Sequence, residues 1–145
     1  MSEANKLLSR RSFEEIWNQR NLELVDEFYA VDYRGHITAR AEVIQGPAAL
    51  KQFAVMFQFA FPDIRFNIND QIAEGDRVAS RWTVTGSQQG EFLGIAPNGD
   101  AITLAGISIQ HFGAGKIIES WDNWDALSIL QRTTGDIFEL LSMGV

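Results

Sequence analysis

The hydrophobic pattern of the chain changes period at Pro62, and this change limits the possible folds. Before Pro62, four apolar residues recur at the spacing of one helix face, namely Leu50, Phe53, Phe57 and Phe61. Gly46 and Pro47 mark the start of this helix, and Pro62 marks its end. After Pro62, Ile64, Phe66 and Ile68 alternate with polar residues, which is the period of a strand with one buried face. Two periods in one chain predict an α+β protein.

The rest of the pattern predicts helices first and an antiparallel meander after them. We expect helical structure over residues 1–29, a short strand or a turn over 31–38, and strands over 64–69, 78–85, 101–112 and 117–121. Two short helices are expected over 125–132 and 136–143. The sequence therefore predicts a single domain over residues 1–145, with helices packed on one side of a curved, mainly antiparallel sheet. The many aromatic residues are expected to fill the core or to line an apolar pocket where the sheet bends away.

Charge and composition exclude several classes of function. The net charge is −7, and the 12 Lys and Arg residues are scattered, which argues against binding to nucleic acid or to an anionic membrane. With no cysteine, the chain has no disulfide and no thiolate nucleophile. The most apolar run, residues 53–61, is far too short to cross a membrane, and the N-terminal stretch lacks the apolar core of a signal peptide. We expect a soluble, cytoplasmic protein.

Motifs for nucleotides and metals are absent from the sequence. There is no phosphate-binding loop, no dinucleotide fingerprint and no serine nucleophile elbow. The two histidines, His36 and His111, lie far apart, so a zinc site would need both of them to be brought together with carboxylates. We expect no metal and no cofactor, which leaves carboxylates, histidines and hydrogen-bonding side chains as candidates for chemistry.

The segment from His111 to Asp125 holds the strongest candidates. Trp121 and Trp124 precede Asp125 by four residues and one residue, and shielding by an indole would raise the pKa of this carboxyl toward that of a general acid and base. His111, on the preceding strand, is within possible reach of Asp125 or of a substrate oxygen. The alternative is that Asp125 caps the following helix, which would lower its pKa. Both interpretations stay open, and Asp122 and Glu119 are expected to be solvated charges at a strand end.

Three segments together carry a resemblance to a known family. They are "FPDIRFNINDQIAEGDRVASRWTVTG", "GEFLGIAPNG" and "GKIIESWDNWDALSILQR". The chain resembles the SnoaL-like polyketide cyclases, also called predicted ester cyclases, most densely over residues 61–132. The resemblance implies a cone-shaped α+β barrel and a homodimer formed through the sheet. It also implies intramolecular aldol condensation of a polyketide methyl ester without cofactor or metal.

The resemblance also assigns roles to individual residues. The essential acid and base of the family corresponds to Asp125, and a strand histidine fourteen residues earlier corresponds to His111. Gln88 stands where many members have a histidine that faces the cavity, and glutamine hydrogen-bonds but does not titrate. The turn at 113–116 and the segment 131–135 also depart from the family pattern, which affects the substrate more than the fold.

The sequence thus predicts a cofactor-independent acid/base enzyme for a small, largely apolar carbonyl compound. Asp125 would remove a proton alpha to the carbonyl, and His111 and Gln88 would hydrogen-bond the enolate oxygen. Further substrate-binding residues are expected at His36, Trp17, Phe53, Phe57, Trp82, Phe92 and Trp121. The alternatives are a non-catalytic ligand-binding dimer, an isomerase, an epoxide or ester hydrolase, and a protein-interaction module.

Overall fold

The computed structural model describes residues 2–37, 41–92, 96–97 and 99–125. Helical structure at the N-terminus comprises α1 (Ser2–Arg11), the π-helix η1 (Ser12–Asn18), the 3₁₀ helix η2 (Leu22–Leu24) and the short α2 (Val25–Phe28). The long helix α3 (Gly46–Ala60) has a proline in its first turn, where its missing N–H costs nothing. These elements confirm the predicted helices, whereas those expected over 125–132 and 136–143 lie outside the described residues.

Within the described residues, six strands form one mixed sheet in the order β2-β1-β6-β5-β4-β3. They are β1 (Tyr29–Ile37), β2 (Ile44–Gln45), β3 (Arg65–Glu74), β4 (Arg77–Ser87), β5 (Ala101–Gly113) and β6 (Lys116–Trp124). Strands β3 to β6 form the expected antiparallel meander, and β1 pairs in parallel with β6. The outer strands β2 and β3 do not pair with each other, so the α+β fold has a curved, open sheet rather than a closed barrel.

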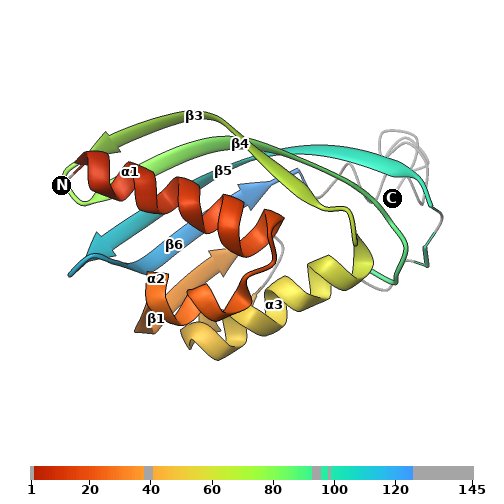
Figure 1. Cartoon of the computed structure of the whole chain (residues 1–145), viewed down its shortest axis with the longest axis horizontal. Helices are drawn as coiled ribbons and strands as arrows, with labels where there is room; N and C mark the ends of the chain where they lie inside the picture. The colour runs from red at the N-terminus through yellow and green to blue at the C-terminus, as the bar shows by residue number, and fades with distance from the viewer. Residues whose placement is uncertain (1, 38–40, 93–95, 98, 126–145) are drawn as a thin grey trace, which may run out of the picture.

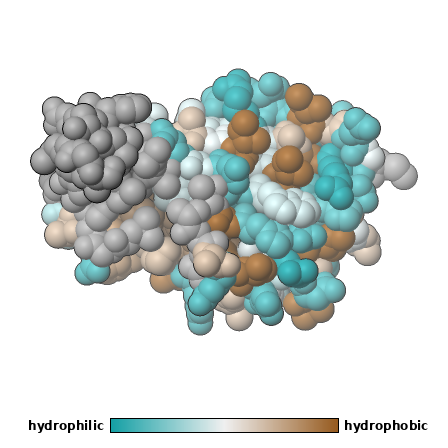
Figure 2. Space-filling view, turned by 180° about the vertical axis from the view of Figure 1, so that it is seen from behind, coloured by the Kyte–Doolittle hydropathy of each residue, from teal (hydrophilic) through white to brown (hydrophobic). Residues whose placement is uncertain are grey.

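The helices cover one face of the curved sheet, as Figure 1 shows. Helix α1 packs against β3 and β4 on one half of this face, and α3 packs against β1 on the other half. Along β5 the even-numbered residues from Leu104 to Phe112 are buried on the helix-covered side, and Ile107 and Ile109 are exposed. We call the helix-covered side the inner face and the other side the outer face. Figure 2, seen from behind, shows hydrophobic side chains scattered among hydrophilic ones.

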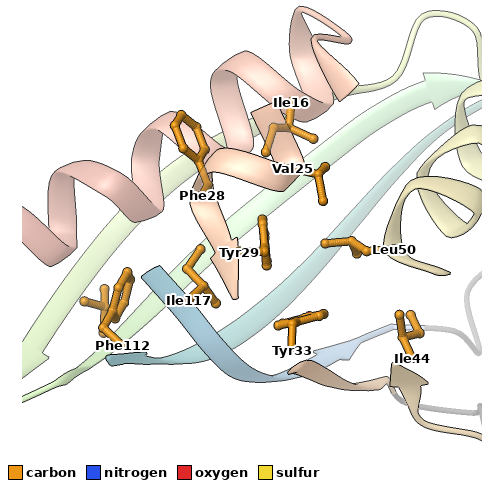
Figure 3. Close-up of a cluster of buried hydrophobic side chains, with 10 residues drawn as sticks. Ile16, Val25, Phe28, Tyr29, Tyr33, Ile44, Leu50, Phe112 and Ile117 are labelled. Carbon is orange, nitrogen blue, oxygen red and sulfur yellow. The ribbon is translucent and has the colours of Figure 1, made fainter. Parts of the chain in front are cut away.

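The buried hydrophobic residues form two clusters between the helices and the inner face. The first joins the N-terminal helices to β1, β5 and β6 and includes Val25, Tyr29, Tyr33 and Ile117, four of the residues drawn in Figure 3. The second joins η1 and the end of α3 to the middle of β4 and β5, and it includes Trp82. Because the two clusters meet without filling all the space, a cavity remains between them, lined by members of both.

Candidate active site

The cavity lies between η1, α3 and the inner face of the sheet, and its volume is about 90 Å³. Most of its wall is aromatic or aliphatic, with side chains from η1, α3 and strands β1 and β3 to β6. The polar side chains in the wall, apart from two tyrosines, are Ser12, Ser108, Gln110, Ser120 and Asp122. An apolar cavity with a few polar groups is typical of a site for a small organic ligand.

Asp122 brings a carboxyl group into this wall. It lies on β6, where Ser120, Asp122 and Trp124 alternate with residues that face the other way and all three line the cavity. Asp122 pairs with Ser108 of β5 in the strand register, and Ser120 pairs with Gln110. The prediction that Asp122 is a solvated strand-end charge is therefore wrong.

Two chains of hydrogen bonds end on the two oxygens of Asp122. In the first, Trp82 Nε1 donates to Ser108 Oγ at 2.9 Å, and Ser108 Oγ donates to Asp122 Oδ1. An indole N–H only donates, so the hydroxyl proton of Ser108 is left for the carboxylate. In the second chain, Ser120 Oγ donates to Asp122 Oδ2 at 3.3 Å.

Tyr33 completes the second chain from the parallel strand β1. Its hydroxyl lies 2.5 Å from Ser120 Oγ, and it is the donor whenever Ser120 gives its own proton to Asp122. Burial raises the pKa of the Tyr33 phenol well above its ordinary value, and the nearby Asp122 carboxylate raises it further. The phenol therefore keeps its proton at neutral pH and remains a donor.

The environment raises the pKa of Asp122 above the ordinary value of an aspartate. Desolvation is the larger cause, and the hydrogen bonds from Ser108 and Ser120 oppose it by stabilising the carboxylate. Asp122 is half-buried because its side chain borders the cavity. An apolar ligand that fills the cavity would remove the remaining water and strengthen the desolvation. A carboxyl tuned in this direction accepts a proton more readily than an exposed one.

Two glycines allow the aromatic donors to reach the serines. Trp82 on β4 lies opposite Gly106 on β5, and its ring occupies the space that a Cβ at Gly106 would need. On β1, a Cβ at Gly35 would lie 2.6 Å from the Tyr33 hydroxyl oxygen. Each ring therefore lies against bare backbone, with its polar atom directed at the neighbouring serine.

His111 and Asp125 do not meet in the structure. His111 lies between the inner-face residues Gln110 and Phe112 near the end of β5, and its Nε2 is 2.8 Å from Oδ2 of Asp76 in the β3–β4 turn. The exposed Asp125 follows β6, and its backbone N–H donates to the carbonyl of Ala105. His111 is six residues further along β5 than Ala105, which is roughly 20 Å at the rise of a strand. A hydrogen bond between His111 and Asp125, one of the alternatives that the sequence left open, is therefore not formed, and their catalytic roles stay a prediction.

Trp121, which was expected to wall the cavity, and His36, whose orientation the sequence left open, both face away from it and do not line it, and their role in substrate binding stays a prediction. Trp121 lies between Ser120 and Asp122 in β6, and the alternation of a strand places it on the outer face. The imidazole of His36 stacks on the Trp121 indole, with ring centroids 5.4 Å apart. His36 Nε2 also lies 2.7 Å from Oε2 of Glu119, and this hydrogen bond lowers the pKa of that carboxyl.

The other predicted substrate-binding residues divide into two groups. Trp17, Phe53, Phe57 and Trp82 line the cavity, and their role in binding stays a prediction. Phe92 is buried and packs on Phe57 with ring centroids 4.8 Å apart. Gln88 is also buried, and its amide donates to the backbone carbonyl of Gly90 at 3.1 Å.

The sequence-based prediction missed the polar residues of the inner face. Ser108 and Gln110 on β5, and Ser120 and Asp122 on β6, are polar residues two positions apart in strands that are otherwise apolar on that face. This spacing was the available signal, because side chains two apart share one face of a strand.

The described part of the chain contains no group of three or more His, Asp or Glu side chains placed to hold a metal ion. Within the same residues, no helix is long and apolar enough to cross a membrane.

Comparison with known proteins gives a consistent match. A family model described as SnoaL-like polyketide cyclase matches residues 8–133. No curated protein sequence matches the chain significantly.

Solved structures share the fold over nearly the whole chain. The structure called "Putative SnoaL-like polyketide cyclase from Jannaschia Sp. CCS1" has a TM-score of 0.86 and 21% identity, covering 93% of this chain and 94% of that one. AclR, called "a putative hydroxylase from Streptomyces galilaeus", has a TM-score of 0.80 and 27% identity, covering 92% and 98%. IdmH, called "a putative polyketide cyclase from Streptomyces antibioticus", has a TM-score of 0.75 and 24% identity, covering 88% and 96%.

Proposed function

This chain belongs to the SnoaL-like polyketide cyclase family, and we propose that it is a cofactor-independent enzyme with Asp122 as its general acid and base. The substrate class is a small, largely apolar carbonyl compound, as the aromatic wall of the cavity suggests. The observation that carries the proposal is the Asp122 carboxyl, which borders this apolar cavity, receives two hydrogen-bond chains and has a raised pKa.

The proposed reaction is a proton transfer followed by ring closure. The Asp122 carboxylate takes a proton from the carbon alpha to a ketone or ester carbonyl, and the C–H electron pair passes into the enolate. The enolate carbon then attacks a second carbonyl carbon of the same molecule, which forms the C–C bond of an aldol product. The new alkoxide takes the proton back from Asp122, so the product is an isomer of the substrate and the enzyme is restored.

The enolate oxygen needs a hydrogen-bond donor, and Ser120 is suited to provide one. Once Asp122 carries the proton it is neutral and holds the Ser120 hydroxyl less strongly, because hydrogen bonds to an ionised acceptor are stronger. Ser120 is already the more distant donor, at 3.3 Å from Asp122 Oδ2. The Ser120 hydroxyl then turns and donates to the enolate oxygen. The Tyr33 hydroxyl, 2.5 Å from Ser120 Oγ, supports it by donating to this oxygen.

The competing assignment keeps Asp125 as the acid and base with His111 as its partner, as expected from the sequence. A further alternative is a binding protein that holds its ligand without chemistry. Isomerisation would use the same proton transfer at Asp122 but return the proton to a different carbon. Hydrolysis would require a water held against the carboxylate instead.

Exchange of an acidic C–H proton in D₂O tests the proposal without knowledge of the natural substrate. We would follow deuterium incorporation at C1 of 2-tetralone by NMR, with the wild type, Asp122→Asn and Asp125→Asn. The wild type is expected to accelerate exchange over buffer. Asp122→Asn should lose about 10²-fold or more of this acceleration, the range for removal of a general base. Asp125→Asn should stay within about twofold, as for a surface change.

The two variants separate the competing assignments. Loss of exchange in Asp125→Asn with retention in Asp122→Asn would transfer the role to Asp125. If 2-tetralone binds but neither the wild type nor either variant accelerates exchange, the protein is a binding protein for this class of ketone. Circular dichroism of both variants shows that a loss of exchange is not a loss of fold.

We also propose that the chain forms a homodimer through the outer face of the sheet. One row of cross-strand neighbours runs over five strands on this face, namely Ile72, Ala79, Ile109, Trp121 and His36. Ile72 is 68% exposed and Ile109 is 40% exposed, which is unusual for isoleucines in the middle of strands. Sedimentation velocity should find a dimer for the wild type and a monomer for Ile109→Lys, and a monomeric wild type would contradict the proposal.

A further inference from the structure

Gln110 is a second polar group in the wall of the cavity. Its side chain is only 4% exposed, and its Oε1 is buried without a hydrogen bond from any residue that the structure describes. A buried acceptor without a donor is unfavourable, and buried polar groups in proteins are nearly always paired. Since Gln110 borders the cavity, a bound ligand is placed to supply the missing donor.

The strand register fixes the position of Gln110 relative to Asp122. Gln110 lies opposite Ser120, and Ser108 lies opposite Asp122, so Gln110 and Asp122 are diagonal neighbours on the inner face. The backbones of diagonal neighbours in an antiparallel pair are about 7–8 Å apart. Two side chains at this separation on one face of the sheet can contact opposite ends of the same small cyclic ligand.

We propose that Gln110 selects ligands that carry a hydroxyl group across a ring from the carbon that Asp122 deprotonates. The substrate class is then a hydroxylated cyclic or aromatic ketone, with the hydroxyl donating to Gln110 Oε1. A hydroxyl suits this position because the surrounding wall is apolar and a charged donor would lose more hydration on entering it. The inference rests on the proposed function for the choice of Asp122 as the reacting end.

Binding of matched ligands tests this selection. 6-Hydroxy-2-tetralone has its hydroxyl across the aromatic ring from the acidic C1, and 6-methyl-2-tetralone has nearly the same shape without the donor. Quenching of tryptophan fluorescence reports binding, because Trp17 and Trp82 line the cavity. The wild type is expected to bind the hydroxyl compound about tenfold more tightly than the methyl compound. In Gln110→Leu this preference should disappear, so that the two compounds bind about equally.

Gln71→Leu is the matched control. Gln71 also has a buried Oε1 without a partner among the described residues, but its amide contacts Lys6 and Ser80 beneath α1 instead of the cavity. The preference for the hydroxyl compound should therefore be unchanged in Gln71→Leu. Gln110→Glu keeps an acceptor at the same place and should retain a preference, which covers the case in which Gln110→Leu does not fold.

Two results would overturn the inference. They are equal binding of both tetralones by the wild type, and a tenfold preference that persists in Gln110→Leu. The second result would indicate that water, rather than the ligand, satisfies Gln110. Repeating the binding measurement in the Asp122→Asn background separates the two proposals, because the preference at Gln110 needs no proton transfer. Loss of exchange activity without loss of this preference would therefore affect only the proposed function.

Discussion

Ser108 of β5 and Asp122 of β6 face each other across the strand pair, and the Ser108 hydroxyl donates to Oδ1 of the Asp122 carboxyl. The hydroxyl proton is not directed at Trp82, because the indole N–H only donates and the Ser108 oxygen accepts from it. The pair therefore joins a fixed donor to a carboxyl that desolvation pushes toward its neutral form. The hydrogen bond from Ser108 lowers the pKa of Asp122 and desolvation raises it, and the balance of the two effects determines how the site responds to pH.

Replacement of Asp122 by asparagine should change how stability depends on pH. Folding raises the pKa of Asp122, so in the wild type stability falls as pH rises from the ordinary aspartate value of about 3.9 through the higher folded value. Asp122→Asn lacks this loss. It should be as stable as the wild type or more stable at pH 7, and its advantage should shrink toward pH 4. Urea unfolding at both pH values measures the difference.

The control for this measurement is Asp125→Asn, because Asp125 is an exposed carboxyl only three positions further along the chain. Because Asp125 does not line the cavity, Asp125→Asn should not reproduce the pH-dependent advantage of Asp122→Asn. If instead Asp122→Asn is destabilised at pH 7 and recovers at pH 4, the hydrogen bonds from the serines outweigh desolvation in the folded protein.

Removal of the Ser108 hydroxyl should raise the pKa of Asp122 further, because the carboxylate loses its donor at Oδ1. In Ser108→Ala the acid limb of the exchange-rate profile is therefore expected to move to higher pH. The variant should also lose about 1–3 kcal/mol of stability, since Trp82 Nε1 is left buried without an acceptor. Ser108→Thr keeps the hydroxyl and should leave the acid limb at the pH of the wild type. If the acid limb does not move in Ser108→Ala, the titration of Asp122 does not control the exchange rate.

Addition of a methyl group at Gly106 should disturb the site more than the same change elsewhere on β5. A Cβ at Gly106 overlaps the ring of Trp82, so Gly106→Ala is expected to cost about 1–3 kcal/mol and to weaken the bond to Ser108. At Gly113, a Cβ meets only side-chain atoms of Ile118, the nearest of them at 3.3 Å, and Gly113→Ala should cost less. Equal costs in thermal unfolding would show that the Trp82 ring has room to move.

Loss of the imidazole at position 111 should leave catalysis intact. His111 pairs with the exposed Asp76, and its hydrogen bond lowers the pKa of that carboxyl. His111→Gln is therefore expected to keep the exchange rate of 2-tetralone within about twofold of the wild type. A loss of a hundredfold or more would restore the role expected from the sequence.

The sequence predicted the elements well but placed Asp122 incorrectly, and one boundary explains why. The last strand was expected to end at Trp121, which would leave Asp122 at a solvated strand end. In the structure β6 continues to Trp124, so Asp122 is still within the alternation of a strand and faces inward. Strand boundaries depend on pairing partners, and Asp125 N–H extends the ladder to Ala105 in a way that local sequence does not reveal.

The contact between Tyr33 and Ser120 could not be predicted from the sequence, for a different reason. These residues are 87 positions apart, and they meet because β1 inserts in parallel beside β6. Alternation predicts which face of a strand a side chain occupies, but not which strand lies next to it. The cavity residues Trp17 and Phe57 were predictable, because helical spacing alone places them on the buried faces of their helices.

Two aromatic rings of the cavity lie directly against the backbone of a glycine, which makes one wall of the cavity rigid. The opposite wall is adjustable. Trp82 and Tyr33 are each held by a hydrogen bond and lie close to a glycine, so these two rings form a fixed template for one side of a ligand. Phe53 and Phe57 on α3 meet Trp17 edge-on, through contacts that depend on packing alone. Evolution or engineering of ligand shape is therefore expected to proceed through α3, where ring size is exchangeable without displacing the carboxyl.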